Sequence, residues 1–183
     1  MSEAAPNDWR GDVLKYWFAL NPEQWWRADP DLDADIRERF HDLWEEKRCL
    51  PASSFLDDPL TALAGVILFD QIPRNMFRGH AEQYSTDELA RAIAQAAVDK
   101  GLDEHLAPQE RGFLYMPFQH SEDRDDQRLS MLLFTRLGDA DMLHYAKKHH
   151  DVIARFNRFP HRNGMLGRQP RGEEIAAGDV VPW

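Results

Sequence analysis

Five arginines and one histidine lie between Val152 and Gly172, a stretch that contains neither Asp nor Glu. The stretch is unusual for this chain, because the whole sequence has a formal net charge of -10. The planar guanidinium of arginine forms paired hydrogen bonds to carboxylates and phosphates, which lysine does not match. The stretch therefore predicts either an anion-binding site or a network of contacts between arginines and carboxylates.

Two further segments carry groups that could bind a ligand or move a proton. They are residues 70–75 (Asp-Gln-Ile-Pro-Arg-Asn) and residues 120–122 (His-Ser-Glu). A histidine near a carboxylate can serve as an acid–base pair. With the arginine-rich stretch, these segments give the candidate ligand-binding residues Asp70, Gln71, Arg74, Asn75, His120, Glu122, Gln127, Arg158, His161, Arg162 and Asn163. The catalytic candidates among them are His120, Glu122, His161 and Asp70, and no motif identifies a nucleophile.

Other reactive residues lack the spacing that their chemistry needs. His144, His149 and His150 do not form the i, i+4 pair of a helical metal site, and His149 lies on an apolar stripe. Cys49 has no flanking signature of an activated thiol. We therefore expect no metal and no cofactor.

Helical patterns must position these groups, since no segment shows the sustained alternation of a strand. The expected helices cover about residues 8–21, 31–49, 60–71, 85–101, 108–117, 121–138 and 141–157, with a short one near 173–177. Asp8 or Asn7 is expected to cap the first of these helices, and Ser121 the sixth. Pro73 and Pro117 are expected to end the third and fifth.

The fourth helix is expected to begin with a capping box at Ser85-Thr86-Asp87-Glu88. About seven helices with short loops predict an all-α fold, either an antiparallel bundle or a superhelix of helix pairs. We expect one domain over residues 1–183, with a core at 10–175 and a C-terminal tail at 164–183. If successive helices alternate in direction, one end of the molecule gathers Asp70, Arg74, His120, Glu122, Arg158, His161 and Arg162.

Composition excludes several classes of protein. Hydrophobic residues make up 43% and charged residues 30% of the chain, as in ordinary globular domains. The acidic balance argues against extended nucleic-acid binding, because such binding needs a basic face. No apolar run is long enough for a membrane span, and the N-terminus has no signal-peptide pattern. With a single cysteine as well, we expect a cytoplasmic protein of undetermined oligomeric state.

Three segments resemble a known family. Residues 69–79 (FDQIPRNMFRG), 110–122 (ERGFLYMPFQHSE) and 155–163 (RFNRFPHRN) are similar to the bacterial domain of unknown function 924. The resemblance covers about residues 13–174 and implies a fold like that of tetratricopeptide (TPR) α/α superhelices, with no established activity. The motif positions are Asp70, Gln71, Pro73, Arg74, Asn75, His120, Ser121, Glu122, Gln127, Arg158, Pro160, His161, Arg162 and Asn163. Gly112 departs from the family pattern and is expected to loosen its helix by about 1 kcal/mol.

Three functions remain open. The leading hypothesis is binding of a small anionic ligand or a peptide carboxylate in a cleft of Arg, His, Asp and Glu at one end of the helices. The alternatives are an enzyme that uses His120 or His161 with Glu122 or Asp70, and a protein-interaction module whose arginines only join helix ends. The anion-cleft hypothesis and the structural hypothesis differ in what they expect of Arg162→Ala. Loss of an unburied cleft residue lowers the free energy of unfolding by about 0.5 kcal/mol or less, and loss of one half of a buried ion pair by about 3–5 kcal/mol.

Overall fold

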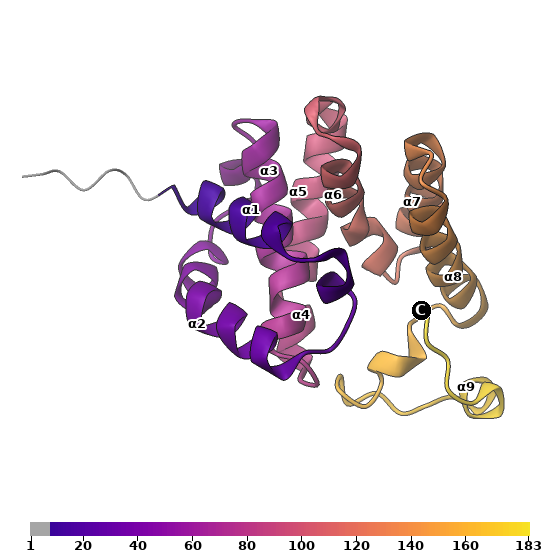
Figure 1. The fold of residues 1–183 in the computed structure, drawn as a ribbon. Coiled ribbons are helices and arrows are strands. Elements are labelled where there is room, and N and C mark those ends of the chain that lie inside the picture. Colours follow the sequence, from indigo (N-terminus) through magenta and orange to yellow (C-terminus); the bar gives the residue numbers. More distant parts are fainter. Residues whose placement is uncertain (1–7) are drawn as a thin grey trace, which may run out of the picture.

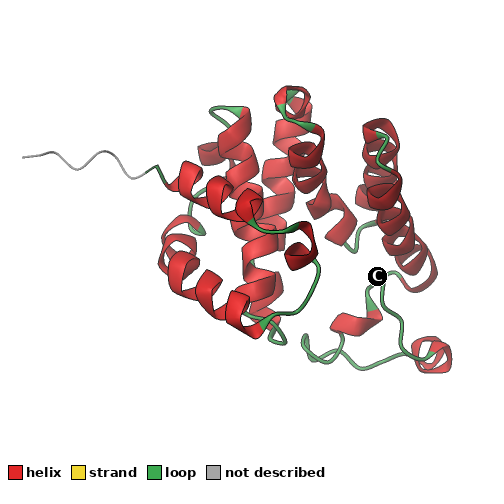
Figure 2. Ribbon diagram, viewed as in Figure 1, coloured by secondary structure: helices red, strands yellow, loops and turns green. Residues whose placement is uncertain are grey.

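A computed structural model describes residues 8–183, and over this range the chain consists of helices and loops without β-strands (Figures 1 and 2). The expected all-α fold is confirmed. The α-helices are α1 (Trp9–Ala19), α2 (Pro30–Lys47), α3 (Pro59–Val66), α4 (Ile72–Met76), α5 (Asp87–Asp99), α6 (Pro108–His120), α7 (Arg124–Leu137), α8 (Ala140–Phe156) and α9 (Gly172–Ala177). Within residues 8–183, no helix has both the length and the apolarity of a membrane span.

Short turns complete the chain. Five are 3-10 turns, η1 (Pro22–Trp25), η2 (Ala52–Phe55), η4 (Ala81–Tyr84), η5 (Leu102–His105) and η6 (Pro160–Arg162), and η3 (Ile67–Gln71) is a π-helical turn. Asp8, one of the two residues expected to cap the first helix, caps α1 by accepting the Gly11 amide N–H. The other expected cap, Asn7, lies outside the described residues.

The centre of the molecule is one continuous run of helix, in which α3, η3 and α4 follow one another without a break (Figure 1). Residues 62–69 of this run are completely or almost completely buried. Helices α1, α5 and α6 pack against α3, and α2 packs against α4. A helix that is apolar on all sides gains stability only when its neighbours cover it, at about 1.5–3 kcal/mol for each large apolar side chain buried.

The expectation that Pro73 ends the third helix is wrong. The helix continues through Pro73 to Met76. A proline has no N–H to donate to the carbonyl four residues earlier, which here is Phe69. The Thr86 hydroxyl donates to the Phe69 carbonyl at 2.7 Å instead, so this buried acceptor is satisfied and the helix can continue.

Both expected serine and threonine caps are also wrong, because their hydroxyls have other partners. Thr86 precedes α5 but makes no capping hydrogen bond, since its hydroxyl binds Phe69 and accepts from the Trp44 indole at 3.2 Å. At α7 the cap is Asp123, whose side chain accepts the backbone N–H groups of Asp125 and Asp126. The Ser121 hydroxyl donates to the Asp126 carboxylate at 2.7 Å.

Helix α6 does not break at Pro117 and extends to His120, against expectation. Residues 112–119 are buried, and tertiary packing outweighs the local cost of the proline. Gly112 has a role that the family comparison did not suggest: a Cβ at this position would lie 2.7 Å from the Met142 methyl carbon. The glycine therefore leaves room for the end of the Met142 side chain of α8.

The last part of the chain returns towards the centre of the molecule. After α8, residues 157–183 pass below the other helices and include α9, and the C-terminus lies near the end of α8 (Figure 1). Arg158 fixes this segment by two hydrogen bonds to Glu174, at 2.5 and 2.7 Å. The segment thereby places Arg162 beside the ends of α4 and α6.

Candidate functional site

The π-helical turn η3 places a carboxylate, that of Asp70, inside the protein with 0% exposure. Its oxygens accept hydrogen bonds from Gln71 Nε2 at 2.6 Å and from His120 Nδ1 at 2.8 Å, and Arg74 Nη1 lies 3.5 Å away. Burial alone would favour the neutral acid, but Arg74, His120 and Gln71 outweigh it and hold the pKa of Asp70 well below its ordinary value. Asp70 is therefore ionised, and its partners are fixed by it. Residues in π turns often belong to functional sites.

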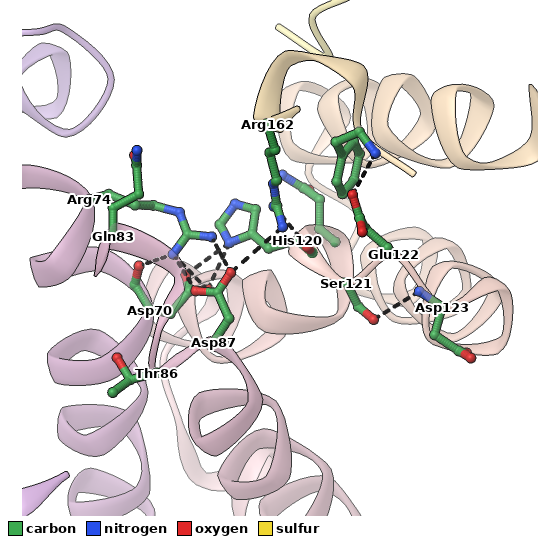
Figure 3. A network of polar contacts seen from close by, with 12 residues as sticks. Asp70, Arg74, Gln83, Thr86, Asp87, His120, Ser121, Glu122, Asp123 and Arg162 are labelled. Atoms are coloured by element: carbon green, nitrogen blue, oxygen red, sulfur yellow. Dashed lines mark hydrogen bonds and ion pairs between the residues drawn. The ribbon is translucent and has the colours of Figure 1, made fainter. Parts of the chain in front are cut away.

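Two arginines from separate elements approach one further carboxylate, that of Asp87 at the start of α5 (Figure 3). Arg74 of α4 donates to both of its oxygens, at 2.7 and 2.9 Å. Arg162 of η6 comes only within 3.8 Å, which is too long for a hydrogen bond. Asp87 was missed in the sequence because its position after Ser85-Thr86 suggested a helix cap.

Arg162 is buried but incompletely paired. The residue is 8% exposed, and its guanidinium lies over the rings of Tyr84 and Phe159 at 4.5 and 4.6 Å from their centroids. Its hydrogen bond from Nη2 to the His120 carbonyl is 2.9 Å long, and Nε has no partner among residues 8–183. Burial and the nearby Arg74 lower the pKa of Arg162, because both disfavour its charge. A bound anion would remove this penalty.

His120 ends α6 and connects the buried carboxylate to the surface. Its Nδ1 lies 2.8 and 3.0 Å from the two oxygens of Asp70, and its side chain is 15% exposed. An ionised carboxylate can only accept, so Nδ1 carries the proton and neutral His120 keeps a lone pair on Nε2. Over the described part of the chain, Nε2 makes no hydrogen bond, and it is free to accept a proton.

These groups border a cleft of ≈ 400 Å³ between the N-termini of α5 and α7, the C-terminus of α6, and η6. Its lining includes Tyr84, Asp87, Arg91, His120, Glu122 and Arg162. Burial is the main reason that the pKa of Tyr84 is raised, so its hydroxyl keeps its proton. The cleft is large enough for a small metabolite and offers both donors and acceptors.

Glu122 lies beside the cleft, but its carboxylate is already engaged. Arg168 donates to both of its oxygens at 2.7 and 3.0 Å, and the Phe159 amide donates at 2.7 Å. Burial favours the neutral acid, yet these hydrogen bonds hold the pKa of Glu122 below its ordinary value. Glu122 therefore anchors the C-terminal segment.

Other residues expected in the site are directed elsewhere. Arg158 and Asn163 both donate to Glu174, so they hold α9 rather than border the cleft. Asn75 donates to Asp33 of α2 at 2.8 Å. Gln127 donates to the carbonyls at the end of α6, including that of Gln119 at 2.8 Å.

Two histidines, the buried His149 and the half-buried His161, lie close to His120 without reaching Asp70. His149 has its ring centroid 5.8 Å from that of His120, and burial with the charge of its neighbours lowers its pKa to about 3. His161 packs between Phe159 and Trp183, and burial together with Arg162 lowers its pKa to about 4. Both are neutral at pH 7, and no carboxylate among residues 8–183 forms a hydrogen bond with either ring to orient it.

The described residues contain no group of three or more His, Cys, Asp or Glu side chains placed to hold a metal ion. Cys49 is exposed at the end of α2, far along the chain from these elements. The cleft accordingly offers hydrogen bonds and charges from protein side chains. Of the candidates predicted from sequence, Asp70, Gln71, Arg74, His120 and Arg162 form one connected network, with Glu122 beside it.

Comparison with known proteins gives a family but no activity. Residues 13–177 match the model of a family of bacterial proteins of unknown function (DUF924), and the chain belongs to this family. A solved structure of a protein of unknown function from Agrobacterium tumefaciens is similar, with 36% sequence identity and a TM-score of 0.86. The match covers 92% of this chain and 95% of that one. No curated protein matches this sequence.

Proposed function

We propose that this member of the DUF924 family binds a small anionic ligand, with a carboxylate or a similar group held by Arg162 in the cleft. The observation that carries the proposal is a buried guanidinium with one hydrogen bond among the described residues and an unpartnered Nε. Buried charges in proteins are normally paired, and each unsatisfied donor costs about 1–3 kcal/mol. An anionic ligand in the cleft pairs with the charge of the Arg162 guanidinium, since Arg162 lines the cleft.

The surrounding residues support this role for Arg162. Asp87 is already neutralised by two hydrogen bonds from Arg74, so it does not compete strongly for Arg162 at 3.8 Å. Tyr84 and Phe159 stabilise the guanidinium by cation–π contacts, with their ring centroids 4.5 and 4.6 Å from Cζ. Small-molecule sites commonly combine a few such polar groups with aromatic walls.

The test is equilibrium binding of acetate, succinate and inorganic phosphate, measured by calorimetry at constant ionic strength. We expect at least one to bind to the wild type and to raise its melting temperature with concentration, because a ligand at a hundredfold excess over Kd adds about 2.7 kcal/mol to the free energy of unfolding. Arg162→Gln should abolish binding, and the exposed Arg136→Ala should leave it unchanged. Equal binding by wild type and Arg162→Gln would remove Arg162 from the proposal.

A second function is favoured by the Asp70–His120 pair, namely acid–base catalysis on the bound ligand. The buried carboxylate orients the imidazole and fixes its tautomer, as in enzymes where a carboxylate supports a histidine base. Glu122 and His161 fit this role less well, since Glu122 is bound by Arg168 and the Nδ1 of His161 is buried without a partner in residues 8–183. His120 with Asp70 is therefore the pair to examine.

Nitrogen NMR tests this arrangement directly. For the neutral imidazole of His120 we expect the Nδ1–H tautomer, and in Asp70→Asn a mixture of tautomers, because a neutral amide no longer requires the proton on Nδ1. His80, which is exposed and accepts the Glu82 amide on Nδ1, is the internal reference. An Nε2–H tautomer for wild-type His120 would rule out Nε2 as the base.

We also keep two broader expectations as part of the proposal. A cytoplasmic location is supported by a sequence with one cysteine, which cannot form an internal disulfide. A TPR-like arrangement is supported by the succession from α5 to α8, in which each helix packs on the next one in sequence.

A further inference from the structure

The cleft has more acidic than basic side chains, which is unexpected for a site that holds only an anion. Five carboxylates line it against two arginines. The acidic residues are Asp87, Glu88, Glu122, Asp123 and Asp126, and the basic ones are Arg91 and Arg162. A field of this sign repels a ligand with only negative charge and lowers its rate of association.

Most of these carboxylates are neutralised by arginines. Asp87 is paired with Arg74, Asp126 with Arg91 at 2.6 Å, and Glu122 with Arg168. In each case the guanidinium donates at least two hydrogen bonds to its carboxylate, which is the strong geometry for such pairs. These pairs leave the cleft walls rigid and close to neutral.

Two carboxylates remain without a cation. Glu88 is exposed at the first turn of α5 and has neither a hydrogen bond nor an ion pair within the described part of the chain. Asp123 accepts two backbone amides on Oδ1, at 2.8 and 3.0 Å, while no donor among residues 8–183 reaches its Oδ2. The cleft thus has an underpaired cation, Arg162, and two unpaired carboxylates around the same volume.

We propose that the ligand of this cleft is zwitterionic, with an anionic group held by Arg162 and an ammonium group beside Glu88 and Asp123. This inference rests on the proposed function, and it specifies the class of ligand as an amino carboxylate. Arg162 is buried with one hydrogen bond and an unpartnered Nε among residues 8–183, so it favours an anion, while the unpaired carboxylates of Glu88 and Asp123 favour a cationic group on the same ligand. A zwitterion meets both conditions in one molecule.

The probes are ω-amino carboxylates from 3-aminopropanoate to 6-aminohexanoate, each compared with the carboxylate of equal chain length and with butylamine. Binding is measured by calorimetry on the whole protein at low salt. We expect at least one amino carboxylate to bind about fivefold more tightly than its matched carboxylate, since an exposed ion pair contributes up to that factor. The chain length with the largest ratio measures the span between the two groups.

Variants separate this inference from the proposed function. The double variant Glu88→Gln/Asp123→Asn keeps the α7 cap, because asparagine also caps helices, and should bring the ratio below about twofold. Glu38→Gln, an exposed residue of α2, should leave the ratio unchanged.

Three outcomes would overturn the inference. If amino carboxylates and plain carboxylates bind equally, the ligand class is wrong and Arg162 remains an anion site. If butylamine binds as tightly as any amino carboxylate, the cleft is a cation site instead. If no probe binds at all, the proposed function fails together with this inference.

Discussion

Replacing Arg162 by alanine tests whether this side chain holds a ligand or only joins helices. Arg162 is neither an unburied cleft residue nor one half of a close ion pair, the two cases that the sequence suggested. It is buried, and its nearest carboxylate among residues 8–183, that of Asp87, is 3.8 Å away. The substitution removes one charge-assisted hydrogen bond, about 1.5–3 kcal/mol, and two cation–π contacts, about 1 kcal/mol each. It also relieves the cost of burying an underpaired charge, which offsets part of the loss.

The net expected loss of unfolding free energy is therefore about 1–3 kcal/mol. For a chain of this length, each kcal/mol lowers the melting temperature by about 2–4 °C. Arg74→Ala is the comparison: it strands the carboxylates of both Asp70 and Asp87 and should cost about 3–5 kcal/mol. Asp87 is not stranded in Arg162→Ala, since Arg74 still binds it.

The assay is urea unfolding of wild type and both variants, with and without the anion that binds most tightly. We expect the anion to stabilise the wild type and the control variant Arg136→Ala. It should have no effect on Arg162→Ala. The reasoning is refuted if Arg162→Ala is as unstable as Arg74→Ala while no anion stabilises the wild type. Arg162 would then be a structural clip.

Three further predictions concern pH, the C-terminal segment and helix packing. The folded-state pKa of His149, about 3, lies below its unfolded value near 6.5. Between these values the unfolded chain binds more protons than the folded one, so stability falls as pH decreases from 6.5 to 3. His149→Gln should flatten that part of a plot of melting temperature against pH. Arg158→Ala should release α9, which Arg158 holds through Glu174, and limited proteolysis should then cut after residue 163 faster than in wild type. Gly112→Ala should not gain the about 1 kcal/mol that helix propensity favours, because its Cβ meets the Met142 side chain. The double variant Gly112→Ala/Met142→Ala should relieve that contact. Urea unfolding of both variants measures the difference.

The positions of most helices followed from the sequence because helix formation is local. Repeats of apolar residues every three or four positions marked α2, α7 and α8, and the acid-free stretch marked the arginines. The buried helix α3 was visible as a run that is apolar on all sides.

Prolines and caps were misjudged where a distant group changed the local balance. Pro73 reads as a helix end only while the Phe69 carbonyl is left without a donor, and the donor, Thr86, is 17 residues away from it. The same hydroxyl looked like a helix cap in the sequence. Local signals cannot reveal which of two uses a hydroxyl serves, because that depends on which segments pack together.

The sequence by itself determined the all-helical fold, the residue types of the site and the arginine-rich segment that reaches it. Only the tertiary structure decided which charges are paired. Asp70 and His120 are 50 residues apart yet 2.8 Å from one another, and Arg74 rather than Arg162 takes Asp87. Pairing is decided by differences of 1 Å between the ends of separate elements, since a hydrogen bond present at 2.8 Å is lost at 3.8 Å. That difference leaves Arg162 without a hydrogen-bonded carboxylate among residues 8–183.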